Sequence, residues 1–170
     1  MKLDDKGYNN LLETEGLRLN PYLDTQGIPT IAVGNTYYLD GRKVKITDPP
    51  MQKKDAIALY THTADKFAAK VDKLIISAVN QNQFNACVHM AYNIGLGGFE
   101  TSTVLKLINK NPNDPKIADA IMMWIKDREL IPRRIREMKY YFDYPNSCKE
   151  VINSLAEKNM KLYNDFINNK

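Results

Sequence analysis

The stretch "EGLRLNPYLDTQGIPT" (residues 15–30) stands where the apolar pattern of the chain changes from helical to strand-like. Ahead of it, positions spaced i, i+3, i+4 and i+7 form one stripe that ends in an acid: Tyr8, Leu11, Leu12 and Glu15. This spacing predicts a helix over residues 4–15 that is stopped by Gly16. An acid in line with such a stripe should be buried, and burying a carboxylate costs free energy unless the group is used. Glu15 is therefore a candidate functional residue.

Strand-like alternation follows, from Leu19 to Ile46. "TQG" (25–27) predicts a turn between two strands, and "DG" (40–41) is a strong hairpin signal between "TYYL" and "RKVKI". These signals predict a small antiparallel sheet of about three strands.

From Met51 the pattern is helical to the end of the chain. A long amphipathic helix is expected over residues 54–75. Asn80 and Gln83 resemble a capping box, and Gly95, Gly97 and Gly98 should break the helix that they open. Three more helices are expected: one capped by Ser102 and running through Ile108, one capped by Asp114-Pro115 and running through Lys126, and one with Pro132 in its first turn and reaching about Phe142.

We therefore expect an α+β fold with a small antiparallel sheet lobe, a larger helical lobe and an active-site cleft between them. The sequence predicts one domain over residues 1–144, with the sheet lobe at about 16–47 and the helical lobe at about 51–144. Residues 145–170 are expected to form a final helix packed on this domain. The alternative, an amphipathic helix for a membrane surface or a partner, is disfavoured by its nearly balanced charge.

Composition limits the classes of partner. The chain has 170 residues, a net charge of +4 and a pI near 8.9, which suits a polyanionic surface. The basic cluster "RRIR" (133–136) alternates with apolar residues, so we expect no nucleic-acid binding. No run approaches the ~18 apolar residues that span a bilayer, so we expect no stable membrane insertion. Acids stand in the N-terminal stretch where a signal peptide is apolar, so we expect synthesis in a cytoplasm.

Cysteine and histidine are sparse. Cys87 and Cys148 lack ligand-like spacing and are expected to be reduced structural thiols, with a disulfide as the alternative. His62 and His89 have no metal-ligand neighbours, so we expect no metal site.

Three polar residues then converge. Asp24 ends the first strand, and the turn folds Thr30 back toward it, while Glu15 arrives from an apolar helix face. Burial should raise the pKa of Glu15, whereas a solvated Asp24 should stay near its usual value. This division suits acid-assisted cleavage of an acetal. Taken alone, the spacing leaves other readings open: a helix-end acid bonded to an arginine, and an aspartate that begins an Asx turn.

The stretch "ETEGLRLNPYLDTQGIPTIAVGNTYY" (13–38) resembles the opening signature of the phage-type lysozymes, the endolysin family that includes the lysozyme of T-even phages. Further blocks agree in the same order: "NQNQFNACVHMAYNIG", "GGFETSTVLKLIN" and "RRIREMKYYF". The resemblance covers roughly residues 5–143.

It implies that Glu15 is the general acid and that Asp24 and Thr30 activate a water on the opposite face of the sugar, with inversion. It also matches Asn35, Thr36, Tyr92 and Ser102 to substrate-binding positions. For Tyr92 the alternative is core packing, and for Ser102 it is helix capping. Arg134 is expected to support the site by pairing with Glu15, with Arg133 or a structural bridge as the alternative.

The chain departs from the family at two positions. "TIAVGN" has Ala32 where the family often has glycine and Asn35 where it often has histidine. Asn35 offers only neutral hydrogen bonds, so an ion pair is lost. For Ala32 we expect an ordinary β conformation.

The resemblance implies a peptidoglycan hydrolase that cuts the β-1,4 bond between N-acetylmuramic acid and N-acetylglucosamine without a cofactor. It would be a monomer that accumulates in the host cytoplasm and reaches the wall after a separate holin acts. Two alternatives stay open: a lytic transglycosylase, and a catalytically silent cell-wall-binding module of the same fold.

Overall fold

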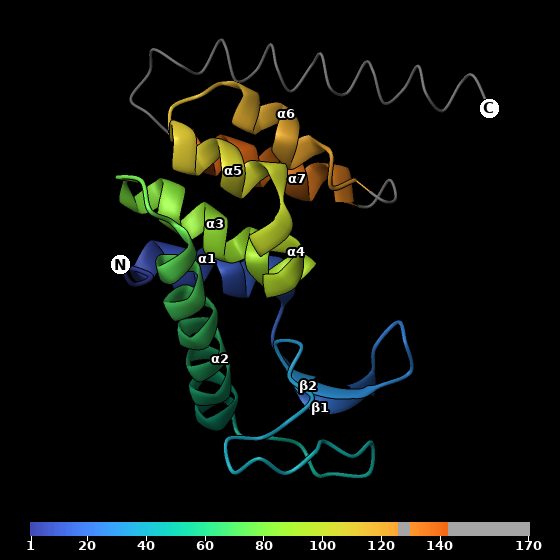
Figure 1. Cartoon of the computed structure of the whole chain (residues 1–170). Coiled ribbons are helices and arrows are strands. Elements are labelled where there is room, and N and C mark those ends of the chain that lie inside the picture. Colours follow the sequence, from blue (N-terminus) through green and yellow to red (C-terminus); the bar gives the residue numbers. More distant parts are fainter. Residues whose placement is uncertain (126–129, 143–170) are drawn as a thin grey trace, which may run out of the picture. The chain divides into compact units, whose positions relative to one another are not determined.

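The computed structural model describes residues 1–125 and 130–142, and the helix expected over 145–170 lies outside them. The chain forms two compact units, Lys2–Ala69 and Lys70 onward with Met1. Figure 1 follows their elements along the chain.

The first unit begins with α1 (Asp5–Glu15), as the apolar stripe predicts. The Asp4 side chain caps the helix by accepting a hydrogen bond from the Gly7 N–H at 2.8 Å. At the other end Gly16, with φ of 75°, donates its N–H to the Leu12 carbonyl at 2.9 Å. Leu11 is fully buried, whereas Glu15 is only partly buried. The stripe therefore does not bury the acid as deeply as its spacing suggests.

Helix α1 is held against α2 (Lys53–Leu74) by hydrogen bonds and an aromatic contact. The Tyr60 hydroxyl donates to the Tyr8 carbonyl at 2.7 Å, and the Tyr8 hydroxyl donates to the Asp65 carboxylate. The two tyrosine rings meet edge to face with centroids 6.4 Å apart. This contact fixes the first half of α1 relative to the rest of the unit.

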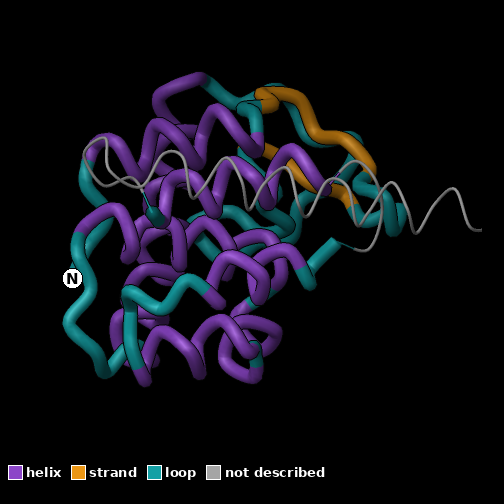
Figure 2. The backbone as a smooth tube through the Cα atoms, turned by 90° about the horizontal axis from the view of Figure 1, so that it is seen from above, coloured by secondary structure: helices purple, strands orange, loops and turns teal. Residues whose placement is uncertain are grey.

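The expected hairpin is present: β1 (Arg18–Leu23) and β2 (Pro29–Ala32) pair antiparallel around the "TQG" turn, drawn in orange in Figure 2. Tyr22 lies opposite Thr30. The register shifts between Arg18 and Tyr22, around Pro21, which has no N–H to give to the ladder.

The expected third strand is wrong for the described residues, which hold a two-stranded sheet. The Asp40-Gly41 turn does form, but backbone pairing behind it amounts to one bridge, between Tyr37 and Lys43. Side chains rather than a ladder close this loop. The Asp48 carboxylate accepts from Tyr38 Oη at 3.0 Å, from Arg42 at 2.9 and 3.0 Å, and from the Lys45 N–H at 2.8 Å.

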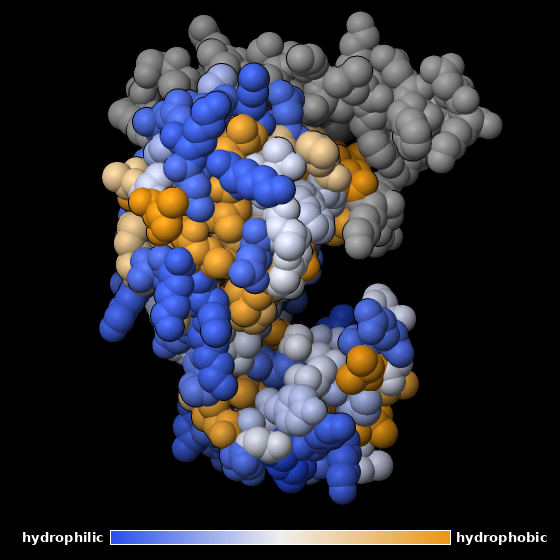
Figure 3. Space-filling model, viewed as in Figure 1, coloured by the Kyte–Doolittle hydropathy of each residue, from blue (hydrophilic) through white to orange (hydrophobic). Residues whose placement is uncertain are grey.

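An apolar cluster joins hairpin, loop and helix in this unit: Ile31, Ala32, Val44, Ala56 and Leu59. It ties β2 to one face of α2. The outer face of α2 carries hydrophilic residues over much of its visible length (Figure 3).

The second unit is helical: α3 (Gln81–Ile94), α4 (Leu96–Thr101), α5 (Thr103–Lys110), α6 (Lys116–Met122) and α7 (Ile131–Tyr141). Helix α3 packs against α4 and α7, and α6 packs against α5 and α7. Residues 83–91 of α3 are all buried, so this helix forms the centre of the unit.

The expected helix starts in this unit are largely confirmed. Asn80 and Gln83 form the capping box of α3, Ser102 caps α5, and Pro132 lies in the first turn of α7. The expected break after α3 is also confirmed, because α3 ends at Ile94 with Gly95 as its C-cap, and Gly97 and Gly98 lie in the next helix, α4. One expectation is wrong. Helix α6 ends at Met122 rather than at residue 126.

The α+β class is confirmed by these elements. Among the described residues no helix is long and apolar enough to cross a membrane.

Candidate active site

The first unit contains Glu15, Asp24 and Thr30. Glu15 is the last residue of α1, and the positive φ of Gly16 turns the chain from the helix toward β1. Asp24 follows β1, and Thr30 lies within β2. All three therefore come from consecutive elements: helix end, hairpin turn and returning strand.

Asp24 organises the hairpin turn. Its Oδ1 accepts hydrogen bonds from the Gln26 and Ile28 N–H groups, both at 2.8 Å. Its backbone closes the same turn, donating to the Ile28 carbonyl and accepting from Gly27, both at 3.0 Å. The Asx-turn reading of this aspartate is thus correct. No hydrogen bond to a described residue engages Oδ2, so the carboxylate is anchored in the turn through one oxygen.

Thr30 is tied to the same turn residue as Asp24. Its Oγ1 donates to the Ile28 carbonyl at 2.9 Å, while Asp24 binds the Ile28 N–H. Thr30 is buried, with 2% of its surface exposed, and Asp24 is half-buried. Because the Thr30 proton is committed to Ile28, the oxygen lone pairs remain to accept hydrogen bonds.

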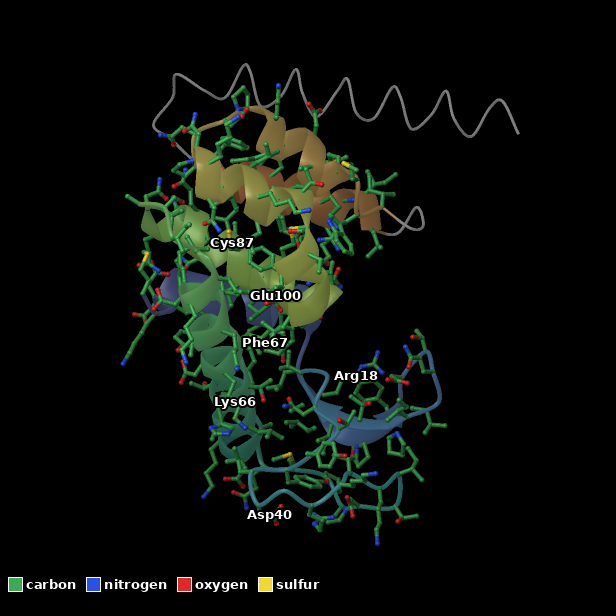
Figure 4. All side chains as sticks on the ribbon, in the orientation of Figure 1. Arg18, Asp40, Lys66, Phe67, Cys87 and Glu100 are labelled. Carbon is green, nitrogen blue, oxygen red and sulfur yellow. The ribbon has the colours of Figure 1, made fainter. Side chains whose placement is uncertain are left out.

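Tyr22 connects the two carboxyl groups electrostatically. Burial raises the pKa of the Tyr22 hydroxyl, Arg18 lowers it, and Asp24 and Glu15 both raise it. Both acids therefore act on one phenol. The Arg18 guanidinium, labelled in Figure 4, stacks over the Tyr22 ring at 4.3 Å from its centroid.

The sequence analysis missed Tyr22 as a site residue. The signal was present in the hairpin register, because an antiparallel pair around the "TQG" turn places Tyr22 opposite Thr30.

The expected β conformation of Ala32 is wrong. Its φ is +55°, in the left-handed region that favours glycine. The cause is the tight return after β2: Ile31 and Asn35 exchange both backbone hydrogen bonds, at 2.8 and 2.9 Å, across only three residues. The alanine therefore adopts a backbone conformation that glycine, the residue the family often has there, adopts without strain.

Asn35 is buried and hydrogen-bonded within the unit. Its Nδ2 donates to Thr63 Oγ1 at 2.7 Å, and Thr63 donates in turn to the Leu59 carbonyl at 3.1 Å. Asn35 therefore makes a neutral hydrogen bond to Thr63, as expected for an asparagine in the place of a histidine. Thr36 is half-buried, and its carbonyl accepts from the Val44 N–H at 2.9 Å.

The other predicted site residues belong to the second unit. Tyr92 is half-buried in α3. Ser102 is buried and fully used as a helix cap, since its Oγ accepts from the Leu105 N–H at 3.1 Å and donates to the Phe99 carbonyl at 2.7 Å. The capping reading of Ser102 is correct.

Arg134 is completely buried in α7. Its guanidinium pairs with Glu137, donates to Asn93 Oδ1 and reaches the Trp124 carbonyl at 3.3 Å. Arg133 binds the same carboxylate, with Nε 3.1 Å from Glu137 Oε1. The structural bridge expected as the alternative is therefore present within this unit. Pairing of Arg134 with Glu15 stays a prediction.

Metal chemistry has no candidate ligand set in the described part of the chain, where no three His, Cys, Asp or Glu side chains gather. Cys87 is a buried free thiol whose pKa is raised mainly by burial. Cys148 lies outside the described residues.

The first unit has a helix that ends in a glutamate, followed by a hairpin that carries an aspartate and a threonine, and the second unit is helical. This arrangement is that of a lysozyme-like α+β protein. Solved structures agree. The endolysin of Escherichia coli O157:H7 phage FAHEc1 matches with a TM-score of 0.77 and 34% identity, covering 86% of this chain and 98% of that one. A P22 lysozyme variant matches with a TM-score of 0.73 and 33% identity, covering 84% and 99%.

The chain belongs to the phage lysozyme family, whose model matches residues 12–137. The endolysin of Salmonella phage P22 is 34% identical over 141 residues, covering 81% of this chain and 95% of the relative. Membership places the chain among the peptidoglycan hydrolases.

Proposed function

We propose that this protein is an inverting N-acetylmuramidase that hydrolyses the β-1,4 bond between N-acetylmuramic acid and N-acetylglucosamine. One observation carries the proposal: Asp24 and Thr30 grip the N–H and the carbonyl of Ile28, which sets a carboxylate oxygen and a hydroxyl oxygen at one turn. Glu15 and Asp24 also act on the same Tyr22 phenol. Family membership supplies the reaction class.

Glu15 is the general acid in this proposal. The glycosidic oxygen leaves as an alcohol only if it receives a proton as the bond breaks. A carboxyl at the end of a helix that is fixed by Tyr8 and Tyr60 is held on a rigid element, which favours a defined proton-transfer geometry.

Asp24 and Thr30 position the attacking water. A water that donates one hydrogen to Asp24 Oδ2 and the other to Thr30 Oγ1 directs a lone pair away from both, toward the anomeric carbon. Asp24 takes the proton as the new bond forms, and attack on the face opposite the leaving group inverts the configuration. The mechanism needs roughly 6.5–9.5 Å between the two carboxyl groups to admit this water.

Further parts of the proposal come from the family resemblance. Thr36 and Tyr92 are assigned to sugar binding, with weaker roles for Asn35 and Ser102, whose side chains are engaged in internal hydrogen bonds. The reaction uses no cofactor. The protein works as a monomer that reaches the wall from the host cytoplasm after a holin acts.

Single-atom changes at the triad test the assignment of roles. Glu15→Gln removes the proton donor and Asp24→Asn removes the base, so each should lower the rate of cleavage of purified sacculi by about 10²–10⁴-fold. Thr30→Val should also slow cleavage, whereas Thr30→Ser, which keeps the hydroxyl, should retain most activity.

The circular dichroism spectrum and melting temperature of each variant must match those of the wild type before a loss of activity is assigned to the catalytic role. Unchanged clearing of sacculi by Glu15→Gln would contradict the role of Glu15 as the acid, whereas a wild type that binds sacculi without clearing them would favour the silent cell-wall-binding module. A transglycosylase, which needs the acid but no positioned water, would lose activity in Glu15→Gln and keep it in Asp24→Asn.

A further inference from the structure

A concave surface lies in the first unit, and none of the triad residues is among those that line it. It is a pocket of about 450 Å³ between the loop that follows β2 and one face of α2. The loop wall includes Asn35, Thr36 and Tyr37, and the helix wall consists of Leu59, His62, Thr63 and Lys66. Asn35 exchanges backbone hydrogen bonds with Ile31, the residue next to Thr30. The pocket is therefore continuous in the chain with the strand that carries the triad threonine.

The helix wall has a graded composition. Leu59, His62, Thr63 and Lys66 recur at helical spacing, so they share one face of α2. Leu59 is buried in the apolar cluster, Thr63 is half-buried, and His62 and Lys66 are exposed. The pocket thus has an apolar floor, a hydroxyl above it, and an ammonium and an imidazole at its rim.

The charge of this pocket is one-sided. No aspartate or glutamate is among the described residues that line it. The nearby acids are engaged elsewhere: Asp65 accepts from Tyr8, Asp48 pairs with Arg42, and Asp40 accepts from the Arg42 N–H at 2.9 Å. No acid stands three or four residues from Lys66 along α2 to neutralise it.

The loop wall is fixed before any ligand arrives. The Asp48 carboxylate collects hydrogen bonds from Tyr38, Arg42 and the Lys45 N–H, and Arg42 stacks on Tyr38 at 4.1 Å from the ring centroid. Tyr37 is left about half exposed at 48%. A preorganised wall lowers the entropy lost on binding.

We propose that this pocket binds a carboxylate of the peptide attached to the glycan chain, with Lys66 as its cation and His62 as a hydrogen-bond donor. The inference rests on the proposed function, because peptidoglycan carries its carboxylates on those peptides. Leu59 and Tyr37 offer apolar surface to the aliphatic part of the peptide. Lys66 is then a specificity residue that distinguishes peptides with free carboxylates from peptides whose carboxylates are amidated.

Binding of two soluble probes tests this inference. The first is a disaccharide–tetrapeptide with free peptide carboxylates, and the second is the same compound with those carboxylates amidated. Titration followed by NMR should show the wild type binding the free form roughly fivefold more tightly, the upper end of what an exposed ion pair contributes. Amide shifts should include Thr63 and Lys66.

Lys66→Met should bring the affinity for the free form down to that for the amidated form and leave the latter unchanged. Lys66→Arg should keep the preference. Lys54→Met, on the same helix and outside the pocket lining, removes equal charge and should bind like the wild type. Melting temperatures check that all variants fold.

Equal binding of both probes by the wild type, or a preference that survives Lys66→Met, would overturn the inference. Because binding needs no cleavage, the two proposals fail separately. A wild type that binds with the expected preference and leaves sacculi intact contradicts the proposed hydrolysis alone.

Discussion

Ala32 shows how one residue can keep a backbone geometry that its own side chain disfavours. It is buried, lies in the apolar cluster of the first unit and has φ of +55°. Left-handed backbone costs an L-residue about 1–2 kcal/mol. The paired backbone bonds between Ile31 and Asn35 and the burial of the methyl group offset that cost.

Ala32→Gly should therefore leave the free energy of unfolding within ~0.5 kcal/mol of the wild type. Relief of strain offsets the loss of a buried methyl, about 0.8 kcal/mol, and the entropy of glycine, about 0.5–1 kcal/mol. Ala56→Gly is the matched control, since Ala56 is buried in the same cluster but lies in α2. It should cost ~2 kcal/mol in urea unfolding. Equal costs for the two variants would show that Ala32 is not strained.

At the scale of elements, the loop after β2 is held by a carboxylate rather than by a ladder. Asp48 receives an N–H from Lys45, a hydroxyl from Tyr38 and a guanidinium from Arg42. These bonds, the Lys45 N–H first, lower the pKa of Asp48 although desolvation opposes them. A folded-state pKa below the unfolded value contributes stability above that value, and the contribution is lost as the pH falls.

Asp48→Asn should thus be less stable than the wild type at neutral pH, and the difference should shrink as the pH falls below about 4. Urea midpoints measured from pH 7 to pH 3 would show this convergence. Asp40→Asn removes a charge from the same loop and controls for net charge. A difference in stability that stays constant over the whole pH range would contradict stabilisation of the loop by the Asp48 carboxylate.

In the second unit, helix α7 contains a buried carboxylate that is bound by two arginines. Glu137 is 5% exposed and binds both Arg133 and the fully buried Arg134. Removing one member of a buried ion pair leaves its partner without compensation.

Glu137→Ala should lower the free energy of unfolding by about 3–5 kcal/mol. Glu100→Ala, at an exposed position in α4, should change it by no more than ~0.5 kcal/mol. Chemical denaturation of both variants measures the difference, and a cost for Glu137→Ala as small as that for Glu100→Ala would contradict the buried pairing.

For the whole molecule, sequence patterns predicted what local physics controls. Apolar spacing predicted α1 and α2, and side-chain caps predicted the starts of α3, α5 and α7. Failures came where distant groups decide. The third strand was wrong, because the loop is held by the Asp48 side chain and one backbone bridge. The glycines were correctly predicted to end α3, but the sequence did not indicate that Gly97 and Gly98 lie in a further helix, α4.

In the candidate site, too, the sequence predicted the local contacts and missed those that depend on strand pairing. The hairpin signal predicted that Thr30 folds back toward Asp24, and their shared contacts with Ile28 agree. Tyr22 emerged only from the register and its electrostatic surroundings. The catalytic roles themselves rest on resemblance and chemistry, since spacing alone also fits an Asx turn.

Product analysis tests the central claim most directly. Purified peptidoglycan is digested with the wild type, and the released fragments are analysed by mass spectrometry and by time-resolved proton NMR of the anomeric signals. Inverting hydrolysis predicts fragments that have gained one water and whose new reducing end is N-acetylmuramic acid, first seen as the α-anomer. An anhydro product, or a β-anomer that appears first, would contradict the roles assigned to Glu15, Asp24 and Thr30.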